Sequence, residues 1–158
     1  MSAIKTAGLD HIVLRVADTA RSIAWYESVL GCRVERLLPS LGLVQMRVGA
    51  SLIDLVDIAG PAGRAGGAPA GSKRRNMDHF CVQLAEFDER KIAAYLKRKG
   101  VQQGKVERRY GALGHGPSIY LTDPDGNSVE LKGPPDADQT EQAPGAIWPV
   151  HRRTKRPT

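Results

Sequence analysis

The sequence contains few of the residues that typify secreted, membrane-spanning or nucleic-acid-stacking proteins. Its 158 residues include only two cysteines, Cys32 and Cys81, and both lie in apolar surroundings. Buried free thiols in a reducing compartment fit this pattern better than a disulfide. No apolar run approaches the roughly 20 residues that cross a bilayer, and residues 1–5 lack the hydrophobic core of a secretion signal. We therefore expect a cytoplasmic protein with no membrane partner.

Aromatic residues are also scarce, at 5% of the chain, and only two of them are phenylalanine. Nucleic-acid-binding surfaces stack bases on such side chains, so this shortage counts against them. The net charge of +6 does not reverse the argument, because much of the basic excess lies in residues 73–75 and 151–156. Short basic segments of this kind usually favour solubility, so we predict no nucleic-acid partner.

What the sequence does contain is ordinary for one globular domain. Hydrophobic residues make up 41% and charged residues 25% of a chain long enough to bury a core. Alternating and helical periodicities divide the first part into a strand, a helix and three further strands. These elements are predicted at 9–16, 20–30, 32–38, 43–48 and 51–57. Asp18 and Thr19 suit the start of the helix, and Gly31 suits its end.

The same order of elements returns after a segment rich in glycine and proline. The second set is predicted as a strand at 77–84, a helix at 89–99, a strand at 101–107, a glycine-rich loop at 108–117 and a hairpin at 118–131. Asp10-His11 and Asp78-His79 are separated by 68 residues, and Gly31 and Gly100 by 69. A repeat in this register predicts two βαβββ modules, neither of which covers both faces of its own sheet.

We therefore predict an α+β fold in which two paired βαβββ modules form a curved mixed β-sheet cleft with flanking helices. The domain spans residues 8–133, with module one at 9–58, a flexible Gly/Pro/basic linker at 59–76 and module two at 77–133. Residues 134–158 form an extended basic tail, whose few apolar residues we expect to wrap a partner subunit. Those residues are Ile147, Trp148 and Val150.

The stretch at 118–131 also carries the first chemical signal. Residues 123–127 (DPDGN) form a tight turn, because proline fixes the bend while glycine and asparagine tolerate positive φ. Glu130 then lies mid-strand between apolar neighbours, where an unpaired charge is costly. The candidate partners are His11 and His79, at equivalent places in the two modules. We interpret these three residues as ligands of one metal ion, with Asp54 in the fourth symmetric position.

These motifs together resemble the vicinal oxygen chelate superfamily, which includes glyoxalase I, extradiol dioxygenases, fosfomycin-resistance enzymes and bleomycin-binding proteins. The resemblance is carried by residues 10–18 (DHIVLRVAD), 22–26 (SIAWY), 29–31 (VLG) and 123–131 (DPDGNSVEL), and covers about residues 8–133. It implies paired βαβββ modules, a small-molecule substrate and a homodimer in which modules from two chains complete a site.

The resemblance also implies a divalent metal ion, namely Ni, Zn, Fe, Mn or Mg, held by His11, His79 and Glu130. Two imidazoles and one carboxylate leave open positions for a bidentate substrate. Asp54 stands where glyoxalase I has a further acidic residue, but it is one methylene shorter. We count Asp54 as a substrate-binding candidate whose role as a ligand is open, and Glu130 as a catalytic carboxylate as well as a ligand.

Three further residues match family positions. Arg15 resembles a substrate-binding arginine of the bacterial glyoxalase I pattern. Tyr120 resembles the tyrosine in the corresponding hairpin of extradiol dioxygenases, although resistance-type members also carry tyrosine there. His115, nearby in sequence, is a candidate acid or base. The alternatives without a functional role are that Arg15 forms an ion pair with a carboxylate and that His115 lies in a surface loop.

Three functions agree with this pattern. A glyoxalase-like lyase or isomerase would use the metal to bind vicinal oxygens and a carboxylate to move a proton. An Fe(II) extradiol-type ring-cleaving dioxygenase would bind a catechol and O₂, assisted by His115 and Tyr120. A fosfomycin- or bleomycin-resistance-type protein would bind a small molecule. We favour the first, because the ligands are intact and many family dioxygenases have twice as many modules.

Overall fold

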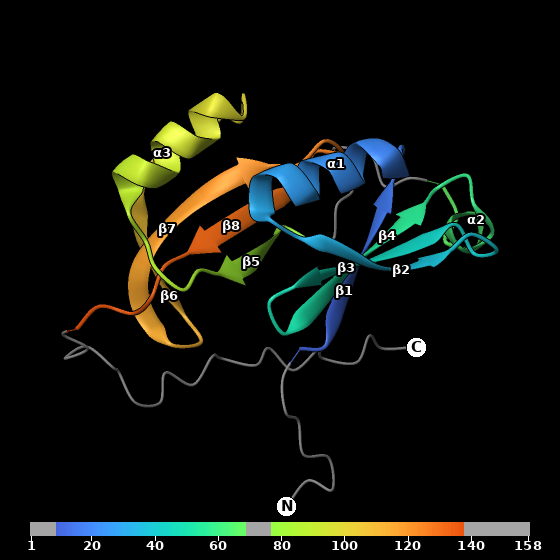
Figure 1. The fold of residues 1–158 in the computed structure, drawn as a ribbon. Helices are drawn as coiled ribbons and strands as arrows, with labels where there is room; N and C mark the ends of the chain where they lie inside the picture. Colours follow the sequence, from blue (N-terminus) through green and yellow to red (C-terminus); the bar gives the residue numbers. More distant parts are fainter. Residues whose placement is uncertain (1–8, 69–76, 138–158) are drawn as a thin grey trace, which may run out of the picture.

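A computed structural model describes residues 9–68 and 77–137, which form two copies of one βαβββ unit (Figure 1). The first copy consists of β1 (His11–Val16), α1 (Thr19–Leu30), β2 (Arg33–Leu38), β3 (Leu43–Val48) and β4 (Ser51–Asp57). The second consists of β5 (His79–Gln83), α3 (Glu89–Arg98), β6 (Glu107–Gly111), β7 (Gly114–Thr122) and β8 (Ser128–Lys132). A short helix, α2 (Pro61–Ala65), follows the first copy.

Each copy forms its own four-stranded sheet, in the orders β1-β4-β3-β2 and β5-β8-β7-β6. Within each sheet the first and last strands of the unit run parallel, while the other pairs are antiparallel. This arrangement confirms the predicted α+β fold of two βαβββ modules. The two sheets are separate hydrogen-bonded ladders in the described parts of the chain, so β1 and β5 are each the edge strand of a sheet.

The helix boundaries follow from their capping residues. The side chains of Asp18 and Asp88 accept hydrogen bonds from the backbone N–H groups of Arg21 and Lys91, which satisfies the free donors of each first turn. After α1, Gly31 adopts φ 68°, a left-handed conformation that glycine enters without steric cost. The helices α1 and α3 therefore begin and end within one residue of the predicted bounds.

The core lies between the helices and one face of each sheet. Apolar side chains at alternate strand positions point toward the helices, and the larger buried ones include Leu14, Met46, Ile53, Leu55, Ile119, Leu121 and Leu131. One cluster centres on module one and another on module two, and Trp25, Leu30 and Phe80 pack against both. Helices α1 and α3 lie on the same side of the two sheets in Figure 1. The opposite sheet faces are left for polar side chains.

The turn at 123–127 fastens module two to α1. Asp125 accepts hydrogen bonds from the backbone N–H of Ala17 at 2.9 Å and from the hydroxyl of Ser22 at 2.8 Å. Asp123, which is buried, accepts one from the buried hydroxyl of Tyr26 at 2.8 Å. The turn therefore holds the two modules together as well as joining β7 to β8.

The chain between α3 and β7 differs from the sequence-based prediction. Residues 101–106 form no strand apart from a single bridge between Gln103 and Leu121, and the predicted loop at 108–117 belongs to the β6–β7 hairpin. Two glycines of this hairpin are needed where they stand, because neighbouring groups occupy the space that a side chain would take. A Cβ on Gly111 would lie 2.6 Å from the Lys132 side chain, and one on Gly116 would lie 2.5 Å from a backbone carbonyl oxygen.

The predicted flexible linker at 59–76 contains a helix, α2, which its composition did not indicate. Residues 69–76 lie outside the described residues. The same holds for residues 138–158, which include the apolar residues predicted to wrap a partner subunit. No helix in the described ranges is long and apolar enough to span a bilayer.

Candidate functional site

Three predicted site residues of module two lie on the sheet face that points away from the helices, namely His79, Tyr120 and Glu130. Strand alternation turns Glu130 to this face, because its neighbours Val129 and Leu131 are buried in the core. The strand register sets Cys81 and Tyr120 directly beside Glu130, on β5 and β7. His79 lies one row away, and its ring meets that of Tyr120 edge-on with centroids 5.3 Å apart.

Glu130 and His79 form a close pair. Oε2 of Glu130 lies 3.1 Å from Nε2 of His79, and the glutamate is only 5% exposed. Its other oxygen, Oε1, is buried and has no hydrogen bond of ordinary geometry to any described residue. A buried carboxylate that lacks a partner on one oxygen is costly. A cation beside His79 would supply that partner, so these two residues suit a metal ion.

Both histidines are oriented in the way that metal ligands commonly are. Nδ1 of His79 lies 2.7 Å from a carboxylate oxygen of Asp78, and Nδ1 of His11 lies 2.6 Å from one of Asp10. A carboxylate on one ring nitrogen fixes the imidazole and directs the other nitrogen, Nε2, toward a metal. The Asp-His pairs of the repeat therefore act as two-residue units.

Module one repeats this layout with different side chains. Asp54 is opposite Val13, two residues after His11, just as Glu130 is opposite Cys81, two residues after His79. Asp54 is buried, and both of its oxygens accept hydrogen bonds from the amide of Gln45, at 3.2 and 3.0 Å. Gln45 thus occupies the place in module one that Tyr120 has in module two.

The electrostatics of the two modules differ. A hydrogen bond to Asp10 raises the pKa of His11, with smaller contributions from the charges of Asp54 and Asp10. In module two, burial and the charge of Glu130 raise the pKa of Tyr120. Burial and Glu130 likewise raise the pKa of Cys81 to about 11, which keeps this thiol protonated at neutral pH and poorly nucleophilic.

The structure brings together two of the three predicted ligands. Across residues 9–68 and 77–137, no group of three or more His, Cys, Asp or Glu side chains is placed to hold a metal ion. His79 and Glu130 meet within module two, whereas His11 lies in module one beside Asp10 and Asp54. A complete set of three ligands therefore requires that the His11 of some module one lie beside His79 and Glu130, which does not happen among the described residues of this chain.

Arg15 has a different environment from the one that the resemblance implies. Its guanidinium donates to the backbone carbonyl oxygens of Gly63, Gly66, Gly67 and Ala68, at and just after the end of α2. These bonds satisfy the free carbonyls at the end of the helix, which is a common role for a basic side chain. Arg15 therefore holds α2 in the structure, and its role in binding a substrate stays a prediction.

His115 also lies away from the other predicted residues. It is on β7, opposite Tyr110, whose ring it contacts edge-on with centroids 5.0 Å apart. Five residues separate it from Tyr120, which is about 17 Å along an extended strand, and an odd separation turns the two side chains to opposite faces. His115 is therefore not beside Glu130 in this chain, and its role as an acid or base stays a prediction.

Two residues of the same sheet face were missed by the sequence analysis, namely Arg109 and Lys132. The register places Arg109 opposite Gly116, and Lys132 opposite Ser118, on the face that carries Glu130. The alternation of polar and apolar residues from 128 to 132 was the signal that could have found Lys132. Arg109 was hidden because its strand was interpreted as a loop.

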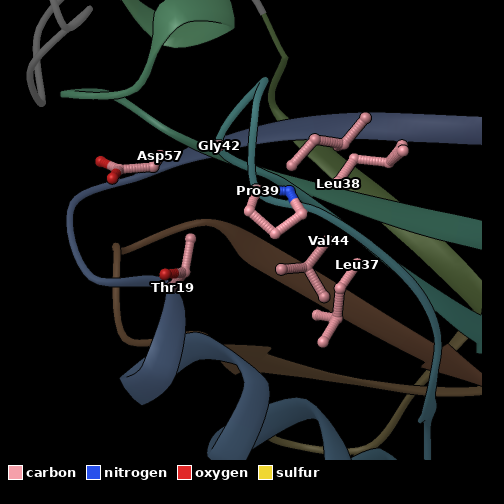
Figure 2. A pocket seen from close by; sticks show the side chains of 8 residues that line it. Thr19, Leu37, Leu38, Pro39, Gly42, Val44 and Asp57 are labelled. Carbon is pink, nitrogen blue, oxygen red and sulfur yellow. The ribbon is translucent and has the colours of Figure 1, made fainter.

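A pocket lies elsewhere in the molecule, between the start of α1 and the β2–β3 hairpin (Figure 2). It is lined by eight residues, among them Thr19, Leu38, Pro39 and Asp57. None of the predicted site residues belongs to this lining, and most of its side chains are apolar. The pocket therefore has no connection with the histidine–carboxylate pair.

Comparisons with known proteins agree with this geometry. The family model described as Glyoxalase/Bleomycin resistance protein/Dioxygenase superfamily matches residues 8–131. Human (Homo sapiens) mitochondrial methylmalonyl-CoA epimerase is 26% identical over 130 residues, covering 78% of this chain and 72% of the human protein. The structure of an integron cassette protein from the mobile metagenome of V. cholerae is similar, with a TM-score of 0.67 and 26% identity, covering 84% of this chain and 98% of that one. Lactoylglutathione lyase from Agrobacterium tumefaciens shares the fold, with a TM-score of 0.59 and 22% identity over 81% of this chain and 94% of its own.

Proposed function

The chain belongs to the glyoxalase/bleomycin resistance protein/dioxygenase superfamily, and from this premise we propose that it is a metal-dependent isomerase or lyase. Its substrate would be a small molecule with vicinal oxygens, on which the protein moves a proton at the carbon next to a carbonyl group. The observation that carries the proposal is the buried pair of His79 and Glu130, in which one carboxylate oxygen has no hydrogen-bond partner.

The metal would be held by His79 and Glu130 of module two together with His11 of a module one. Because a single chain does not gather all three, we propose that His11 comes from a second copy of the chain in a homodimer. A divalent ion bound there would polarise the neighbouring oxygens of the substrate and stabilise developing negative charge. Asp78 and Asp10 would hold the two imidazoles in the required orientation.

The protein's own carboxylates would move the proton. Glu130 would take it from the carbon next to the carbonyl, because it is the buried carboxylate beside His79, where the oxygens of the substrate would be held. In an isomerase the proton returns either to the same carbon from the opposite side or to the neighbouring atom. Asp54 is the symmetric carboxylate of module one, and is therefore the candidate for the second acid–base group.

Tyr120 would orient the substrate beside Glu130 by donating a hydrogen bond. It is opposite Glu130 in the β7–β8 register and contacts the ring of His79. Its hydroxyl, like that of any tyrosine of ordinary pKa, is protonated at neutral pH and can donate a hydrogen bond. An isomerase is favoured because the human relative is named as an epimerase.

Proton exchange with solvent tests this reaction directly. Methylmalonyl-CoA and S-lactoylglutathione would be incubated in D₂O with the protein loaded in turn with Ni, Zn, Fe, Mn or Mg, and deuterium followed by mass spectrometry. We expect metal-dependent exchange on at least one of them, reduced roughly 10²-fold or more in Glu130→Gln and unchanged in His115→Ala. Exchange that survives intact in Glu130→Gln would contradict the role given to that carboxylate.

A further inference from the structure

We propose that the part of the module-two sheet beyond Tyr120 is an anion-binding subsite, in which Arg109 binds a carboxylate or phosphate group of the substrate. This inference deepens the proposed function, on which it relies for the position of the reacting carbon. It narrows the substrate to compact molecules with vicinal oxygens at one end and a second, anionic group at the other.

The strand register places Arg109 on the correct face. Ser118 shares the face of Tyr120, because they are two residues apart on β7, and Gly116 follows at the next position on that face. Arg109 is the residue of β6 opposite Gly116, and Glu107 is the one opposite Ser118. Gly116 has no side chain, and the small, buried Ser118 is the β7 residue that lies between the row of Arg109 and the row of Tyr120.

The guanidinium of Arg109 is accessible and only partly engaged. The Arg109 side chain is 51% exposed, and its ion-pair partner is Glu107, which is itself exposed. A hydrogen bond with the Tyr120 hydroxyl is the main cause that raises the pKa of Arg109, so this side chain interacts with Tyr120 as well as with Glu107. A guanidinium has five N–H donors in a planar fork, which these two partners do not exhaust. The shared sheet face and this contact place Arg109 beside Tyr120.

Lys132 adds a second positive charge at this end of the face. It is only 3% exposed, and Nζ donates to the backbone carbonyl oxygens of Arg109 at 2.6 Å and Gly116 at 3.4 Å. These bonds fasten the hairpin but do not neutralise the ammonium group, and Lys132 has no ion pair with a carboxylate of the described residues. A buried charge without a counter-charge is costly, so an anion at Arg109 would also offset the charge of Lys132.

The sign of the charge therefore changes along this face of the module-two sheet. Glu130 and His79 mark one end, where a metal would bind, while Arg109 and Lys132 mark the other. Glu107 supplies a single negative charge against the two positive ones. A substrate that spans this face would place its vicinal oxygens near Glu130 and its anionic group near Arg109.

Three compounds of matched shape test the subsite. Lactate, malate and 3-phosphoglycerate each have a carboxylate next to a hydroxyl-bearing carbon, and they end in a methyl, a carboxylate and a phosphate group, respectively. Dissociation constants would be measured by ¹H–¹⁵N NMR titration of the full chain, once metal-free after EDTA treatment and once loaded with zinc. The metal-free arm tests the subsite alone, and the zinc arm tests it together with the metal.

Four variants distinguish a specific effect of the Arg109 side chain from a general effect of net charge. Arg109→Gln removes the guanidinium, and Arg108→Gln makes the same change in net charge on the opposite face of β6, where Arg108 pairs with Asp136. Arg109→Lys retains a positive charge without the fork. Glu107→Gln removes the competing carboxylate and should tighten binding of the anionic compounds.

We expect malate or 3-phosphoglycerate to bind wild type at least about tenfold more tightly than lactate, since tenfold corresponds to one good charge-assisted contact. This preference should disappear in Arg109→Gln, be reduced in Arg109→Lys and persist in Arg108→Gln. Whichever compound binds more tightly identifies the anion as carboxylate or phosphate. Equal binding of all three compounds, no binding, or an unchanged preference in Arg109→Gln would overturn the proposal. Failure of the proposed function would appear separately, as zinc that does not bind or does not depend on His79.

Discussion

At the scale of single residues, two buried carboxylates of module two differ in how their oxygens are satisfied. Asp123 accepts hydrogen bonds on both oxygens, from the backbone N–H groups of Asp125 and Asn127, the Asn127 amide and the Tyr26 hydroxyl. Glu130 has His79 beside one oxygen, whereas its other oxygen has no partner of ordinary geometry among the described residues, although Tyr120 and Cys81 interact with the carboxylate. The first carboxylate has the environment of a structural group, and the second has that of a ligand.

This difference predicts opposite effects on stability. Glu130→Gln should raise the free energy of unfolding of the metal-free protein by on the order of 1 kcal/mol, because it removes a poorly compensated buried charge. Asp123→Asn should lower it by about 1–3 kcal/mol, because an amide nitrogen would face a donor. Urea denaturation at a pH where histidines are neutral checks both. A loss of stability in Glu130→Gln equal to that in Asp123→Asn would contradict the distinction.

Residue chemistry explains which site assignments could be predicted from the sequence. Glu130 was predictable because a mid-strand carboxylate between apolar neighbours needs a partner, and Nε2 of His79, one row away on the parallel strand β5, lies 3.1 Å from it. The contacts of Arg15 were not predictable, because its partners belong to α2, in a segment whose composition indicated a flexible linker. His115 was misplaced because its strand was interpreted as a loop, which hid the face to which it points.

At the scale of elements, local capping signals are the most dependable part of the sequence. Asp88 caps α3 with a hydrogen bond from the backbone N–H of Lys91, and this bond is the main cause that lowers the pKa of Asp88. A lowered pKa in the folded state means that the ionised group stabilises the fold. That contribution is complete above the unfolded pKa of about 3.9 and is lost as the pH falls through the folded pKa.

Asp88→Ala should therefore melt at a lower temperature than wild type at neutral pH, and the difference should shrink as the pH falls through the folded pKa of Asp88. Asp88→Asn is the matched control, because asparagine caps a helix about as well as aspartate but does not titrate. Thermal melts followed by circular dichroism over this range measure both variants. A deficit in Asp88→Ala that is independent of pH would argue against the ionised cap.

Long-range pairing was harder to predict than capping. The β6–β7 hairpin appeared as a loop because glycines at 111, 114 and 116 usually interrupt strands. In the structure two of them leave space for the Lys132 side chain and for backbone following β8. These glycines fit into strands because of contacts with residues more than ten positions further along the chain, and a local sequence pattern contains no information about such contacts.

At the scale of the whole molecule, the repeat produces two equivalent half-sites, each with an Asp-His pair and, one row away, a buried carboxylate. The edge strands β1 and β5 carry the histidines, and the structure does not join these edges within one chain in the ranges that it describes. The apolar side chain of Val13 is 54% exposed on β1, two residues from His11. These features agree with a site completed by a second copy of the chain.

Hybrid dimers distinguish a shared site from one within a single chain. His11→Ala and His79→Ala would be denatured together and refolded as a mixture, then assayed for bound zinc. If each site combines His11 of one chain with His79 and Glu130 of the other, half of the dimers are hybrids with one intact site. About one quarter of the wild-type metal should then return. Sites within single chains would give no recovery, and a monomer in light scattering would also contradict the shared site.

The most direct test of the central claim is the metal content of single-histidine variants. Wild type, His79→Ala and His115→Ala would be dialysed against zinc, freed of excess metal and analysed by inductively coupled plasma mass spectrometry. The geometry predicts about one ion per chain in wild type and in His115→Ala and a loss of nearly all metal in His79→Ala, with folding verified by circular dichroism. Equal metal in His79→Ala and wild type would contradict the assignment of the His79–Glu130 pair as a metal site.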